Sequence, residues 1–175
     1  MPSRYYFLSS LPMLRFSATA PMSWEAFLAS AKGNVSNDEY NQLCDMANGI
    51  YGQDAFLQKW ADFETGLKEA VNEQRRLKLG KGSENTLVFK EYEVDLVSNA
   101  VINEKNPLTA EMIMLQSKYD FLEREKGFDA FSRQALYSYA LQLRLLIRKD
   151  CFTSEAGNSE FQRLFGILEN EINMD

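Results

Sequence analysis

The residues best suited to specific recognition are three arginines in an otherwise apolar segment, FDAFSRQALYSYALQLRLLIRK, at positions 128–149. Steps of four, four, three and four residues bring them to one face of a helix, together with a tyrosine and a leucine. We call this set the arginine stripe: Arg133, Tyr137, Leu141, Arg144 and Arg148. Arginine binds carboxylates through two parallel hydrogen bonds, so such a stripe can pair with acids of its own domain or with another protein.

Both alternatives stay open at the level of sequence. If the stripe is internal, its partners are the acids Asp120, Glu123, Glu125 or those near the C-terminus. If it receives another protein of an assembly, the interacting residues are Arg133, Tyr137, Arg144 and Arg148. The internal pairs are favoured, because arginine is enriched at interfaces without being diagnostic of them.

Other chemistry is restricted by the absence of histidine from the chain. A Ser-His-Asp or Cys-His nucleophile cannot be built, and neither can a His-ligated zinc, haem or di-iron centre. The acids Glu91, Glu93 and Asp95 lack the ligand pattern of a calcium loop and suit the start of a solvated helix. The glycine-rich residues 80–83 lack the spacing of a phosphate-binding loop. We therefore expect no enzyme, no cofactor and no metal site.

The charge of the chain argues against a nucleic-acid partner. Its net charge is -6, whereas phosphate binding needs a basic surface. One short basic run fits the end of a helix better than a phosphate or lipid patch, since cations favour that end of the dipole: Arg75, Arg76, Lys78 and Lys81. The cysteines, Cys44 and Cys151, show no metal-site spacing, and buried free thiols are favoured over a disulfide.

The N-terminus resembles an export signal only in part. Arg4 precedes an uncharged run, and Ala18-Thr19-Ala20 could form a cleavage site. Pro12, Arg15 and Pro21 disagree with that pattern, so we expect a cytoplasmic protein. No segment approaches the roughly 20 apolar residues that a membrane-spanning helix needs.

Apolar periodicity predicts the helices that would position the arginine stripe. The expected ranges are about 23–32, 36–48, 53–78, 92–103, 109–126 and 129–149, followed by a last helix from Asn158 or Ser159. Within 87–102 the alternation LVFKEYEVDLV also allows a strand, and the N-terminal YYFLSSLP is left unassigned. Thr109 and Asp129 are the expected N-caps of their helices, and Ser36 with Glu39 forms a capping box.

Two seams predict long helices packed against each other. The first consists of Phe56, Trp60, Phe63, Leu67, Ala70 and Leu77, with Gln74 as its polar member. The second consists of Met112, Leu115, Tyr119 and Leu122. With no βαβ alternation, the chain is expected to form an all-α bundle of about six or seven helices with long antiparallel pairs. We expect one helical domain over residues 1–175, with a candidate sub-boundary at 80–83.

Two pieces of the chain resemble a bacterial family of unknown function whose genes lie beside those of V-type ATPases. They are YYFLSSLP at 5–12 and YALQLRLLIR at 139–148. That family is similar to the protein of V-type and archaeal-type ATPases that sits between the membrane rotor ring and the central stalk. It carries the letter C in the archaeal-type enzymes and d in eukaryotes, and we call it the ring–stalk adaptor. The ring–stalk adaptor is a longer protein with three helical repeats, and this chain has room for part of it.

The resemblance implies a non-catalytic adaptor whose partners are the other V-type ATPase subunits of the stalk and the rotor ring. Such a protein would transport no ion itself, although it would serve proton or sodium transport. It would lie in the cytoplasm and reach the inner face of the membrane only through those partners. The alternative function is an unrelated helical module for protein–protein interaction or regulation.

Overall fold

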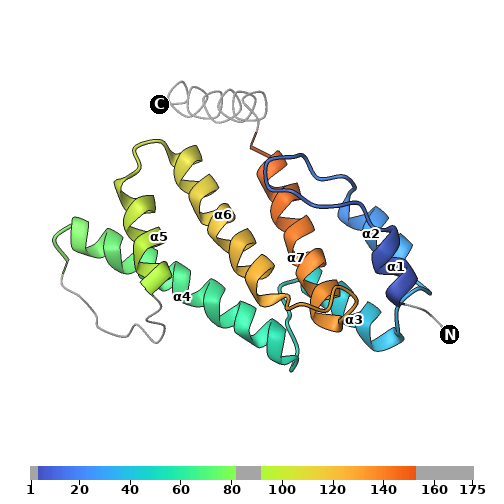
Figure 1. The fold of residues 1–175 in the computed structure, drawn as a ribbon. Helices are drawn as coiled ribbons and strands as arrows, with labels where there is room; N and C mark the ends of the chain where they lie inside the picture. Colours follow the sequence, from blue (N-terminus) through green and yellow to red (C-terminus); the bar gives the residue numbers. More distant parts are fainter. Residues whose placement is uncertain (1–3, 82–91, 153–175) are drawn as a thin grey trace, which may run out of the picture.

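The computed structural model describes residues 4–81 and 92–152, and these residues form seven α-helices and no strand (Figure 1). The helices are α1 (Arg4–Ser10), α2 (Trp24–Ala31), α3 (Asn37–Ala47), α4 (Ala55–Lys78), α5 (Tyr92–Asn103), α6 (Pro107–Glu125) and α7 (Arg133–Asp150). The predicted all-α bundle is therefore confirmed. Residues 92–103 form a helix, as the apolar spacing predicted, and not a strand. The predicted helix from Asn158 or Ser159 lies outside the described residues.

The helices α5, α6 and α7 lie side by side and alternate in direction, so that each neighbouring pair is antiparallel (Figure 1). The long helix α4 packs against α5 and α6, whereas α2 and α3 pack against α7. Helix α7 thus stands between the two groups. None of the described helices is long and apolar enough to cross a membrane.

The central position of α7 explains its composition, because a helix that is covered on most sides must be apolar on most sides. Its buried residues are Ala135, Leu136, Tyr137, Ser138, Ala140, Leu141, Gln142, Leu143, Leu145 and Leu146. The buried polar Ser138 is satisfied, since its hydroxyl donates to the Leu122 carbonyl at 3.0 Å. The sequence prediction of a helix at the centre of a bundle is confirmed.

The N-terminal segment, left unassigned from sequence, forms α1 and a loop that packs on the core. Phe7 and Leu14 are buried in the same apolar cluster as α7. The ring of Phe7 lies 6.0 Å from that of Phe27 on α2. These aromatic and aliphatic contacts attach the segment to the bundle.

Two helix starts differ from the sequence prediction. Helix α6 begins at Pro107, because the Asn106 side chain accepts a hydrogen bond from the amide of Leu108 at 3.0 Å and proline suits a first helical position. Thr109 is therefore inside the helix. The capping box of Ser36 and Glu39 at the start of α3 is confirmed.

The start of α7 is the second correction. Ser132 caps the helix by accepting a hydrogen bond from the amide of Ala135 at 3.0 Å. Asp129 instead accepts from the amide of Phe131 at 2.9 Å, in the turn that precedes the helix. Residues 129–132 thus form an approach to α7, with one side-chain acceptor at each end.

The seam of α4 is confirmed over Phe56, Trp60, Phe63, Leu67 and Ala70, which are all buried. The prediction that Leu77 belongs to this buried seam is wrong, because Leu77 is 48% exposed. It lies in the last turn of α4, which extends beyond α5 (Figure 1). The seam ends where the neighbouring helices end.

Candidate interaction site on helix α7

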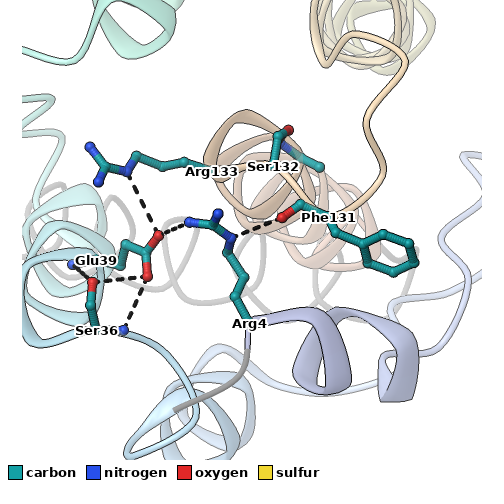
Figure 2. Close-up of polar contacts among 7 residues, drawn as sticks. Arg4, Ser36, Glu39, Phe131, Ser132 and Arg133 are labelled. Carbon is teal, nitrogen blue, oxygen red and sulfur yellow. Dashed lines mark hydrogen bonds and ion pairs between the residues drawn. The ribbon is translucent and has the colours of Figure 1, made fainter. Parts of the chain in front are cut away.

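Arg133 lies at the start of α7 beside a buried carboxylate of α3. That carboxylate belongs to Glu39, which is only 4% exposed. The Nε atom of Arg133 lies 3.7 Å from Glu39 Oε1, and Arg4 of α1 forms a closer ion pair with the same oxygen (Figure 2). The other oxygen accepts hydrogen bonds from the Ser36 amide at 3.0 Å and the Ser36 hydroxyl at 2.9 Å.

Burial alone would raise the pKa of Glu39, but the hydrogen bonds from Ser36 and Arg4 outweigh it and lower the pKa. Glu39 is therefore ionised at neutral pH. Arg4 also donates from Nε to the carbonyl of Phe131 at 2.9 Å, in the approach to α7 (Figure 2). One buried charge thus joins α1, α3 and α7.

Arg144, in the second half of α7, contacts the end of α3. Its guanidinium donates to the carbonyls of Met46 and Ala47, the second at 3.0 Å. These belong to the last turn of α3, whose carbonyls have no partners within the helix. The guanidinium also lies 5.6 Å from the ring centre of Trp24. Arg144 is therefore a structural cap, because its Nη1 and Nη2 atoms bind the end of α3.

Arg148, one turn further along, forms an ion pair with α6. Its Nε and Nη2 atoms donate to Glu111 Oε1 at 2.9 and 2.7 Å. Its guanidinium also lies 5.5 Å from the centre of the Phe152 ring. The Arg148 side chain is 60% exposed, so this pair contributes at most about 1 kcal/mol to stability.

The two middle members of the arginine stripe are buried. Tyr137 and Leu141 are each 3% exposed, and burial raises the pKa of Tyr137 to about 12. The five residues share a face of α7 as the spacing predicts, but they do not form a continuous open surface. Of the four predicted interaction residues, Arg133 and Arg148 are exposed, whereas Tyr137 and Arg144 face the bundle.

The internal partners of the stripe differ from the acids expected from sequence. Glu39 and Glu111 take that role, and three acids of α6 contact other side chains. Glu123 accepts from Gln142 at 2.7 Å, a residue on a different side of α7. The other two acids, Asp120 and Glu125, contact Gln116 at 2.7 Å and Lys59 at 3.1 Å.

The segment between α1 and α2 runs along α7, a contact that the sequence did not predict. The hydroxyl of Tyr139 donates to the carbonyl of Pro12 at 2.9 Å. Lys149 donates to the carbonyls of Phe16 and Ala18 at 2.8 and 2.6 Å, and Asp150 accepts from the amide of Ala20 at 2.6 Å. Nothing in the spacing of these residues signals a partner about 130 positions away.

The remaining candidate features lie at helix ends. The basic residues Arg75, Arg76 and Lys78 occupy the last turn of α4, and Lys78 donates to the Ile102 carbonyl at 2.9 Å. Glu93 and Asp95 lie in the first turn of α5, as expected, whereas Glu91 lies outside the described residues.

Neither cysteine forms a disulfide with the other. Cys44 is partly buried. The expectation of two buried thiols is wrong for Cys151, which is exposed because it follows the last residue of α7 as its C-cap.

Comparisons with known proteins give no relative for this arrangement. No protein-family model, no curated protein and no solved structure matches the chain. The functional assignment therefore rests on the geometry described above and on the resemblance of residues 5–12 and 139–148.

Proposed function

We propose that the protein is a non-catalytic accessory component of a V-type ATPase, similar to the ring–stalk adaptor that lies between the rotor ring and the central stalk. The observation that supports this best is the hydrogen bond from Tyr139 to the Pro12 carbonyl. It joins the two segments that resemble the ATPase-associated family, although 127 positions separate them. The two segments that carry the resemblance are therefore in contact with each other in the fold.

The stiffness of this feature suits an adaptor that passes torque. The N-terminal segment is held to α7 by Tyr139, Lys149 and Asp150, and α7 is covered by helices on most sides. A part built in this way resists shear, because moving one helix breaks hydrogen bonds and apolar contacts together. No step of this role requires an active site.

The exposed ends of the arginine stripe are the proposed contact points. Arg133 and Arg148 have side chains 56% and 60% exposed, so each has N–H groups left to bind partner carboxylates. Attachment to the membrane would be indirect, through the rotor ring.

Affinity purification of the tagged protein from its native cell tests the proposal. We expect stalk or rotor-ring subunits of the ATPase to co-purify, and the variant Arg133→Ala with Arg148→Ala to retain less of them. A matched variant, Lys81→Ala with Lys105→Ala, removes two exposed lysines outside the stripe and should retain them fully. An intact and coupled ATPase in cells that lack the gene would contradict the proposal.

A second candidate function, an unrelated helical interaction module, is favoured by one other feature. An apolar groove of about 580 Å³ lies between α5 and α6, lined by Leu96, Val97, Met112, Ile113 and Phe121. Leu96 is 52% exposed there. If Leu96→Asp abolishes partner capture while the arginine variants do not, this second function replaces the first.

A further inference from the structure

A cavity of about 810 Å³ lies between α4, α6 and α7. Its apolar wall includes two indole rings and a thioether, those of Trp24, Trp60 and Met114. This volume is that of a site for a drug-sized ligand. Arg148 also lines the cavity and is shared with the contact points proposed above. The charged groups that distinguish the cavity lie instead on α4 and α6.

Two lysines approach one carboxylate at the wall of this cavity. The Oε1 atom of Glu64 lies 2.8 Å from the Nζ atom of Lys118 on α6 and 3.7 Å from that of Lys68 on α4. Two ammonium groups therefore share one carboxylate, which leaves one positive charge without a counterpart at this point. The Lys118 side chain is only 15% exposed, and an unbalanced charge is costly where water is scarce.

The cavity wall as a whole carries the same excess of positive charge. Its four cations face two acids: Lys68, Lys118, Arg144 and Arg148 against Glu64 and Glu111. Arg148 and Glu111 form an ion pair at 2.7 Å, whereas Arg144 binds carbonyls of α3, which do not neutralise its charge. An anionic ligand is therefore favoured over a neutral or a cationic one.

Donors on the cavity wall are available to such a ligand. The ammonium group of Lys118 has three N–H groups, and among the described residues its one acceptor is Glu64. The indole N–H of Trp24 is buried and donates no hydrogen bond to any residue that the structure describes. Buried donors in native proteins are nearly always satisfied, so a bound molecule with acceptor atoms would complete the wall.

We propose that this cavity binds a small amphipathic anion, in which a carboxylate head is attached to an apolar body. The head lies between Lys68 and Lys118, where its charge and that of Glu64 balance the two ammonium groups. The apolar body lies against Trp24 and Met114, because burial of apolar surface favours this contact. Binding of this kind goes beyond the proposed ATPase role and does not depend on it.

Titration calorimetry of the full-length protein with decanoate and with naphthalene-2-carboxylate tests the proposal. We expect saturable binding of at least one of these anions at one site per chain, and the tighter one shows whether the apolar body is aliphatic or aromatic. Decylammonium has a ten-carbon chain but the opposite charge, and it should bind at least about tenfold more weakly than decanoate. Binding of neither anion, or equal binding of decylammonium, would overturn the proposal.

Two charge reversals show whether the anion binds at this cavity. Lys68→Glu alters a largely exposed side chain of the wall and should weaken anion binding about fivefold. The matched variant Lys105→Glu reverses an exposed charge in the loop before α6, outside the cavity, and should leave the affinity unchanged. Equal affinities of the two variants would overturn the proposal.

Two larger side chains on α6 test the apolar wall. Met114→Trp narrows the cavity and should weaken anion binding, whereas Met112→Trp adds the same ring in the groove between α5 and α6 and should not. Anion binding that withstands Met114→Trp would assign the ligand to another place and overturn the proposal. All these variants keep Arg133 and Arg148, so the retention of ATPase subunits tests the proposed function separately.

Discussion

The carboxylate of Glu39 and the guanidinium of Arg4 form an ion pair that joins α3 to the first helix of the described chain. The pair is completed by Ser36, the N-cap of α3, and by Arg133 at the start of α7. Three segments from distant parts of the sequence thus depend on one buried charge.

Replacing that charge is expected to destabilise the fold. Glu39→Gln keeps the shape of the side chain but removes the attraction to Arg4 and Arg133, so the free energy of unfolding should fall by about 2 kcal/mol. Urea titration followed by circular dichroism measures this. Asp38→Asn, at the exposed neighbouring position, is the control and should change the free energy by less than about 0.5 kcal/mol.

The stability of the protein should fall in acid. The pKa of Glu39 and that of Glu64 lie below the ordinary 4.5 in the folded state, despite burial, because of hydrogen bonds from Ser36 to Glu39 and from Lys118 to Glu64. Each carboxylate therefore contributes its full stabilisation above its unfolded pKa and loses it as the pH falls through the lower, folded pKa.

Urea titrations from about pH 6 down to about pH 3 test this dependence. The free energy of unfolding of the wild type should fall as the pH drops below 4.5, the ordinary pKa of a glutamate side chain. Glu39→Gln should lose less over the same interval, because it lacks one of the two groups. Parallel curves for the two proteins would show that Glu39 does not contribute.

Arg144 and Arg148 lie one turn apart on α7, but their truncations should differ. Arg144→Ala leaves the Ala47 carbonyl at the end of α3 without its side-chain donor and removes the guanidinium from the Met46 carbonyl, which keeps the Gly49 amide at 3.1 Å, so it should cost about 1–2 kcal/mol. Arg148→Ala removes an exposed pair and should cost less than about 1 kcal/mol. Thermal unfolding of the two variants measures the order, and equal losses would contradict the capping role of Arg144.

Lys149 should protect the loop between α1 and α2 from proteolysis. Its side chain is largely buried and donates to the carbonyls of Phe16 and Ala18, next to the exposed Arg15. In Lys149→Met the loop opens more often, so trypsin should cleave after Arg15 several times faster than in the wild type. Mass spectrometry of timed digests identifies the cut. Lys126→Met, which removes the surface ion pair of Lys126 with Glu123, should leave the rate of cleavage after Arg15 unchanged.

Local chemistry made much of the fold predictable. The capping box of Ser36 and Glu39 and the helix over residues 92–103 both depend on residues within a few positions of one another. Thr109 and Asp129 show the limit, because Asn106 and Ser132 are equally good caps by residue type. Which residue begins the helix is decided by where the chain enters the bundle.

The candidate site was predictable in position but not in its contacts. The spacing of the arginine stripe fixes the face that Arg133, Arg144 and Arg148 share on α7. Their partners come from α3 and α6, and the choice of Glu39 and Glu111 depends on how the helices pack. The cavity of about 810 Å³ between α4, α6 and α7 left no signal in the sequence, because its walls belong to separate helices.

The hydrogen bonds between residues 12–20 and α7 also determine when the N-terminal segment can fold during protein synthesis. The amide of Ala20 finds its acceptor on Asp150, which leaves the ribosome 130 residues later. Until then the nascent chain carries the apolar side chains of Phe7 and Leu14 without the α7 surface that helps to cover them. During translation, these side chains therefore lack their α7 neighbours until the last third of the chain has emerged, and the attachment of the N-terminal segment to α7 is a late event in folding.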